Sequence, residues 1–82
     1  MNIYRHKFWA QCPSDRVQIR YLLQIETGDV IMAERIEREC AFKDPIYHEE
    51  AADRLLMAFG GRQTLEATHG QVEIVTERGS HA

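Results

Sequence analysis

The stretch from Asp44 to Gly61 constrains the fold most, because its start, its end and its buried side can all be read from the residues. Asp44 is a typical N-cap, and Pro45 suits the first helical position, where its missing N–H has no helical partner anyway. At the other end, Gly60 can adopt the left-handed C′ conformation that terminates a helix. The pattern therefore predicts a helix that is capped by Asp44 and stops before Gly60.

One side of this predicted helix is apolar and needs a second layer of structure to cover it. Its members recur at every fourth position, with Ala52 and Leu56 beside them, and are Tyr47, Ala51, Leu55 and Phe59. The side chains expected toward solvent are His48, Glu49, Asp53 and Arg54. Glu50 and Arg54 have the spacing of a helical ion pair.

Two strands are predicted before this helix. Alternation over residues 3–12 gives the first strand one face made of Tyr4, His6, Phe8, Ala10 and Cys12. Alternation over residues 17–26 gives the second strand a core face made of Val17, Ile19, Tyr21, Leu23 and Ile25. Residues 13–16 have the composition of a turn, so the two strands should form an antiparallel hairpin.

Residues 30–42 allow two interpretations. Gly28 and Asp29 can close a second hairpin that a strand then follows through Val30, Met32 and Ile36. Alternatively, a helical stripe is formed by Val30, Ala33, Ile36, Glu37, Cys40 and Ala41. We favour a short helix over about residues 32–41, because its charged middle is poor strand material.

The last part of the chain predicts a second hairpin, in which residues 63–68 and 72–77 flank a turn at His69-Gly70. The element order is then β-β-α-α-β-β. We expect an α+β fold in which one or two helices pack on one face of a four-stranded antiparallel sheet. Residues 1–78 should form a single domain and residues 79–82 a flexible tail.

This element order resembles the unit of the tunnelling fold, which is found in enzymes that handle pterins and purines. Those enzymes associate their sheets side by side into barrels. The resemblance implies a protein whose small-ligand site lies at an oligomer interface. The resemblance rests on the order of elements alone. The chain has no family motif, such as a zinc-binding histidine set, that would identify site residues.

The sequence predicts no catalytic residue, metal site or cofactor. No two of the histidines and cysteines have the two- to four-residue spacing that is typical of zinc ligands; they are His6, Cys12, Cys40, His48, His69 and His81. We expect both cysteines to be buried thiols, and a single disulfide between them is the alternative. The chain therefore favours a non-enzymatic domain.

Composition indicates an ordinary globular domain, with 44% hydrophobic and 28% charged residues. No run approaches the roughly 18 apolar residues of a membrane span, and no signal peptide is recognisable, so we expect a cytoplasmic protein. Charge is unevenly distributed. Residues 1–25 carry four basic and one acidic side chains, whereas residues 26–82 carry six basic and twelve acidic ones.

The face of the sheet that points away from the helices is the predicted binding surface. Alternation assigns to it an apolar group and a basic rim, namely Trp9, Leu22 and Val75 with Arg5, Lys7 and Arg20. The last hairpin adds Glu73 and Glu77 to the same face. The leading hypothesis is association, either with a second copy as a homodimer or with another protein. The alternative is single-stranded nucleic-acid binding, with Trp9 stacking on bases and the basic residues on phosphates.

Overall fold

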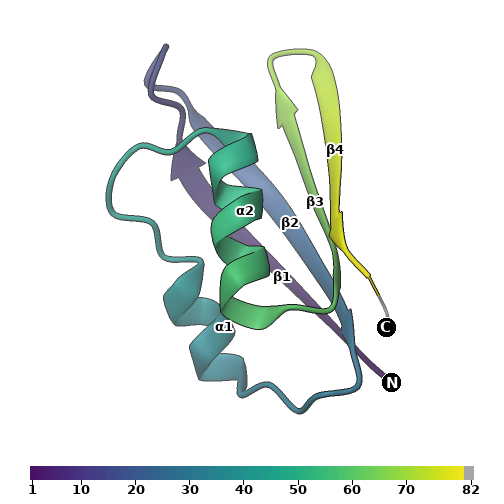
Figure 1. Cartoon of the computed structure of the whole chain (residues 1–82). Coiled ribbons are helices and arrows are strands. Elements are labelled where there is room, and N and C mark those ends of the chain that lie inside the picture. The colour runs from purple at the N-terminus through teal and green to yellow at the C-terminus, as the bar shows by residue number, and fades with distance from the viewer. Residues whose placement is uncertain (81–82) are drawn as a thin grey trace.

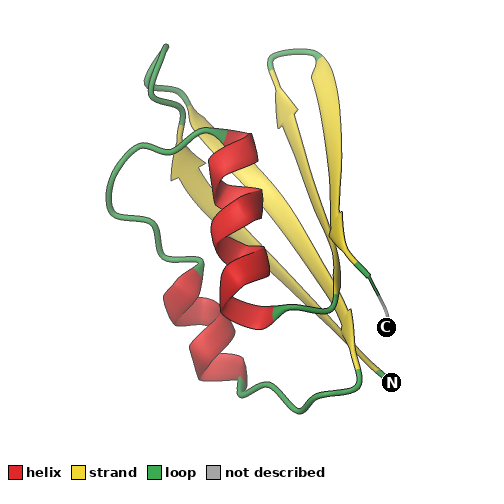
Figure 2. Cartoon of the chain, in the orientation of Figure 1, coloured by secondary structure: helices red, strands yellow, loops and turns green. Residues whose placement is uncertain are grey.

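The computed structural model describes residues 1–80 and confirms the predicted α+β fold. The chain forms β1 Asn2–Gln11, β2 Gln18–Thr27, α1 Ala33–Glu39, α2 His48–Phe59, β3 Arg62–His69 and β4 Val72–Gly79. The four strands make one antiparallel sheet in the order β1-β2-β3-β4. Both helices lie on the same face of this sheet, so the other face has no covering element in the described part of the chain (Figures 1 and 2).

Strands β1 and β2 form the predicted hairpin, in a register that pairs Asn2 with Thr27 and Gln11 with Gln18. The predicted core face of β2 is confirmed at most positions. Across the hairpin, Phe8 of β1 stacks on Tyr21 of β2 with ring centroids 5.1 Å apart. The prediction for Val17 is wrong, because this residue is exposed. It belongs to the turn, where its N–H donates to the Asp15 carboxylate and its carbonyl accepts from Cys12.

The second hairpin turns one residue later than predicted. His69 is the last residue of β3 and pairs with Val72, which leaves Gly70 and Gln71 as the two-residue turn. β4 runs to Gly79, one residue into the segment predicted as a tail. Gly79 has a φ of 77°, and a Cβ there would collide with the Gly61 carbonyl oxygen, so glycine is required. His81 and Ala82, also assigned to the tail, lie outside the described residues.

The predicted start of α2 is wrong. The helix begins at His48, and neither Asp44 nor Pro45 is part of it. The reason is a contact distant in sequence: Ile46 is buried, and its N–H donates to the Gln11 carbonyl oxygen at the end of β1. This bond holds the chain extended beside the sheet until Tyr47, the N-cap residue. As a result Tyr47 is exposed instead of buried.

The predicted end of α2 is confirmed, since Phe59 is the last helical residue and Gly60 follows with a φ of 65°. The short helix favoured for residues 32–41 is confirmed as α1. Of its predicted stripe only Ile36 and Cys40 are buried; Val30, Ala33, Glu37 and Ala41 are exposed.

Both cysteines are free and buried, as expected. Burial raises the pKa of the Cys40 thiol to about 12, so Cys40 stays protonated at any physiological pH. Neither helix in residues 1–80 has the length and apolar character needed to cross a membrane.

Candidate functional site

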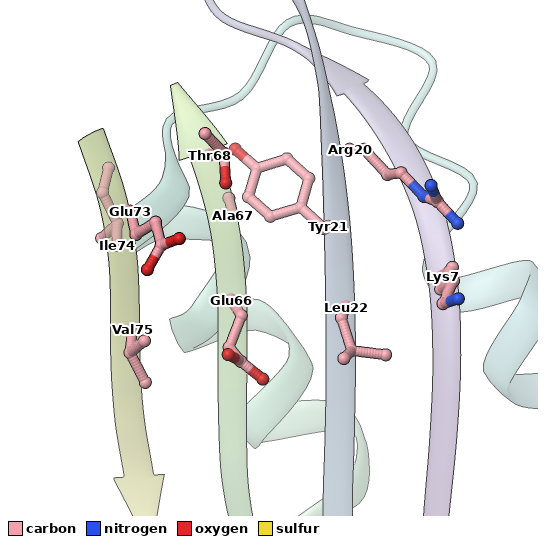
Figure 3. Close-up of a pocket in the computed structure, with 10 residues that line it drawn as sticks. All are labelled: Lys7, Arg20, Tyr21, Leu22, Glu66, Ala67, Thr68, Glu73, Ile74 and Val75. Carbon is pink, nitrogen blue, oxygen red and sulfur yellow. The ribbon is translucent and has the colours of Figure 1, made fainter. Parts of the chain in front are cut away.

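The six residues of the predicted binding surface all lie on the uncovered face of the sheet. The register pairs Lys7 with Leu22, Leu22 with Glu66, and Glu66 with Val75, so these four side chains form one row across the four strands (Figure 3). We call this uncovered side, with its outward residues from all four strands, the open face.

The apolar residues of the open face are brought together only in part. Trp9 pairs with Arg20 and is therefore a diagonal neighbour of Leu22, within reach of a large side chain. Val75 lies two strands from Leu22, with Glu66 between them, which corresponds to roughly 10 Å at normal strand spacing. Trp9 is 61% and Val75 57% exposed.

The open face is divided by charge. The basic residues Arg5, Lys7 and Arg20 lie on β1 and β2, and the acidic residues on β3 and β4 are Glu66, Glu73 and Glu77. At one end the order is reversed, since Glu26 on β2 lies 3.9 Å from Arg62 on β3. A shallow depression of about 230 Å³ lies between the two halves, with Leu22 and Val75 in its lining (Figure 3).

Glu66 is an acidic residue at the centre of this face that was not identified from the sequence. The signal was available in the alternation of β3, where Leu65 and Ala67 are buried and Glu66 is exposed between them. Its position becomes informative only with the register, which places it in line with Leu22 and Val75.

A second candidate site lies on the helix side of the sheet, beside the first turn of α2. It is a mainly apolar cavity of about 300 Å³, which we call the Cys12 cavity. Among the residues that line it are Cys12, Tyr21, Tyr47, His48, His69 and Ile74. An apolar cavity with a few convergent polar groups is the usual form of a ligand site.

His48 is a half-buried residue in the wall of this cavity, where the sequence predicted a solvent-facing residue. Its Nε2 lies 3.1 Å from the Leu65 carbonyl oxygen, so Nε2 carries the proton and Nδ1 the lone pair. Nδ1 is buried and has no hydrogen-bond partner within residues 1–80. Burial lowers the pKa of His48 and raises that of Tyr21, whose ring centroid lies 5.3 Å away.

Three potential metal ligands meet at the edge of the Cys12 cavity. The Asp15 carboxylate lies 2.7 Å from Nε2 of His69, and the donor atoms of Cys12, Asp15 and His69 are all within 4.8 Å of one another. The N–H of Val17 and, to a smaller extent, His69 hold the pKa of the Asp15 carboxyl below its usual range. This cluster was not predicted, because only histidine and cysteine spacings were considered. Including aspartate would have singled out the Cys-x-x-Asp spacing of residues 12–15.

Comparison of the chain with protein-family models, with curated proteins and with solved structures finds no match. Function therefore has to be inferred from the open face and the Cys12 cavity themselves.

Proposed function

We propose that this chain is a non-enzymatic domain that acts by protein association through its open face, and that a second copy of the chain is the partner. The observation that carries the proposal is the division of charge on that face. Basic residues lie on β1 and β2, and three glutamates lie on β3 and β4. A surface of this kind is complementary to itself.

The charges favour one symmetry. A two-fold axis parallel to the strands, between β2 and β3, stacks β1 of one copy on β4 of the other and β2 on β3. Arg5 then faces Glu77 of the second copy, because the two residues lie in the same row through Gln24 and Thr64. Glu26 likewise faces Arg62. An axis perpendicular to the strands stacks β1 on β1 and brings like charges together.

The size of the face indicates how strong this association should be. Four strands of up to ten residues give a flat footprint of roughly 500 Å². Two such faces bury about 1,000 Å² in total, which is the lower end of specific interfaces. We therefore expect a dimer that dissociates on dilution.

The same charge pattern weighs against the alternative of single-stranded nucleic-acid binding. Trp9 is available for stacking and three basic residues lie nearby, but Glu66, Glu73 and Glu77 occupy the other half of the same face. These glutamates repel the phosphates of a strand that crosses the sheet.

The experiment is sedimentation of the wild-type protein and of Leu22→Glu over a range of concentrations. In the proposed dimer Leu22 faces Glu66 of the second copy, so an added carboxylate should weaken dimerisation by about tenfold or more. Met57→Glu is the matched control, because Met57 is 89% exposed on α2, on the helix side. Trp9, the chain's only tryptophan, gives a second readout through its fluorescence.

Equal dimerisation of wild type, Leu22→Glu and Met57→Glu would contradict the use of the open face and would point to pairing through the free edges of β1 and β4, as in tunnelling-fold assemblies. A wild-type protein that stays monomeric at every concentration would contradict self-association.

A further inference from the structure

We propose that Cys12, Asp15 and His69 form a binding site for a divalent transition metal, with zinc the best match. The site is independent of the proposed association, because it lies on the helix side of the sheet and shares no residue with the charged groups of the open face. A thiolate, an imidazole and a carboxylate are all established zinc ligands. The soft sulfur and nitrogen donors select against magnesium and calcium, which take oxygen ligands.

The distances suit a tetrahedral ion. Zinc binds sulfur, nitrogen and oxygen at about 2.0–2.3 Å, which places neighbouring ligand atoms roughly 3.3–3.7 Å apart. The 2.7 Å between Asp15 Oδ2 and His69 Nε2 is shorter than this, and no pair of donor atoms is separated by more than 4.8 Å. Admitting the ion therefore requires these donor atoms to shift relative to one another by roughly 1 Å, which we expect side-chain rotations to supply.

The turn that carries two of the ligands is already fixed. Arg16 donates its N–H to the Cys12 carbonyl oxygen at 2.9 Å, and Cys12 donates to the Val17 carbonyl oxygen at 2.9 Å. The N–H of Val17 in turn donates to Asp15 Oδ1 at 3.1 Å, which leaves Oδ2 directed at His69. A second shell of this kind orients ligands and reduces the entropy lost on binding.

The site is accessible from solvent, and metal binding would displace protons from its ligands. Cys12 is buried, but the side chains of Asp15 and His69 are partly exposed, which gives an ion a route from solvent. On binding, the Cys12 thiol loses its proton to solvent as the sulfur–metal bond forms, and His69 has to present Nε2 without a proton. Metal affinity should therefore increase with pH.

The three residues leave one position of a tetrahedral ion open. Because Cys12 and His69 also line the Cys12 cavity, a metal held between them borders that cavity. His48 and Glu49 lie in the same wall. Water or a small molecule would complete the coordination, as in zinc sites that bind exogenous ligands.

The test is a titration of the untagged, metal-free protein with cobalt(II), followed by displacement with zinc. We expect one equivalent of cobalt, a thiolate-to-cobalt charge-transfer absorption, and loss of that absorption when zinc is added. Cys12→Ala should abolish the absorption, and Asp15→Asn and His69→Gln should each weaken binding by at least about tenfold. Cys40→Ala and His6→Gln are the matched controls and should retain it.

If Cys12→Ala does not fold, Asp15→Asn tests the metal site in its place. Asp15 is exposed in a turn, and asparagine has the same shape as aspartate, so this variant should fold. The proposal is overturned if the wild type shows no charge-transfer absorption, if Cys12→Ala retains it, or if Asp15→Asn binds as tightly as the wild type.

Discussion

His48 begins α2 and directs its ring back toward the sheet, where Nε2 lies 3.1 Å from the Leu65 carbonyl oxygen. Burial is the largest influence on its pKa and lowers it; the hydrogen bond to Leu65 and the charge of Glu49 act in the opposite direction, and Arg78 adds to the lowering. The folded protein therefore takes up a proton on His48 at a lower pH than the unfolded chain does.

This difference predicts how stability depends on pH. The unfolded chain protonates His48 as the pH falls below about 6.5, so the free energy of unfolding should be highest above that pH and fall as the pH drops toward the folded-state pKa. Urea unfolding between pH 5 and 8 measures this slope. We expect it to correspond to the uptake of at most about one proton on unfolding. His48→Gln should remove that part of the slope, whereas His6→Gln should leave it. An unchanged slope in His48→Gln would show that His48 titrates equally in both states.

At the scale of elements, Gln63 fixes the joint between α2 and β3. Its side chain is 3% exposed, and its Nε2 donates to the carbonyl oxygens of Leu55 at 3.0 Å and Gly60 at 2.8 Å. The Gly60 carbonyl follows the last helical residue and has no helical donor, so a strand residue supplies its partner, and the same amide gives the Leu55 carbonyl a second donor.

Gln63→Met should therefore destabilise the protein. The substitution fills about the same volume but leaves the Gly60 carbonyl oxygen without its donor and removes the second bond to the Leu55 carbonyl, at a cost of about 1–3 kcal/mol. Gln71→Met in the exposed turn is the control, with an expected effect within about 0.5 kcal/mol. Chemical denaturation measures both. A Gln63→Met protein as stable as the control would contradict this capping role.

The elements differ in how well the sequence predicts them. Strands β1 and β2 follow from alternation, because a half-buried sheet forces every second residue inward. The end of α2 follows from Gly60, since a positive φ is a local requirement. The start of α2 does not follow from Asp44 and Pro45, because the bond from Ile46 to Gln11 joins segments 35 residues apart and overrides the local capping signal.

The two candidate sites differ in the same way. The membership of the open face was predictable from the period of two, but the separation of Trp9 and Leu22 from Val75 depends on register across three strand pairs. The metal cluster depends on His69 and Asp15, which are 54 residues apart in sequence, meeting at one end of the sheet. A rule based on short sequence spacings cannot detect a contact between residues that are so far apart in the chain.

At the scale of the whole molecule, two layers leave one sheet face without cover in the described part of the chain (Figure 2). Most of the charged residues on that face are basic on β1 and β2 and acidic on β3 and β4. A chain of about 80 residues buries a limited fraction of its surface, so the association that we propose through this face would add burial that one core cannot provide. The two-fold symmetry that we propose predicts a specific pairing, in which Arg5 of each copy would face Glu77 of the other.

The most direct test of this account is sedimentation of two charge-reversed variants, Arg5→Glu and Glu77→Arg, each alone and then mixed in equal amounts. Each variant alone places like charges opposite one another twice, so its self-association should be at least about tenfold weaker than that of the wild type. In the mixture both contacts are again between opposite charges, and the account predicts that the dimer returns as a heterodimer of the two variants. A mixture that associates no better than the separate variants would contradict docking of two copies through the open face.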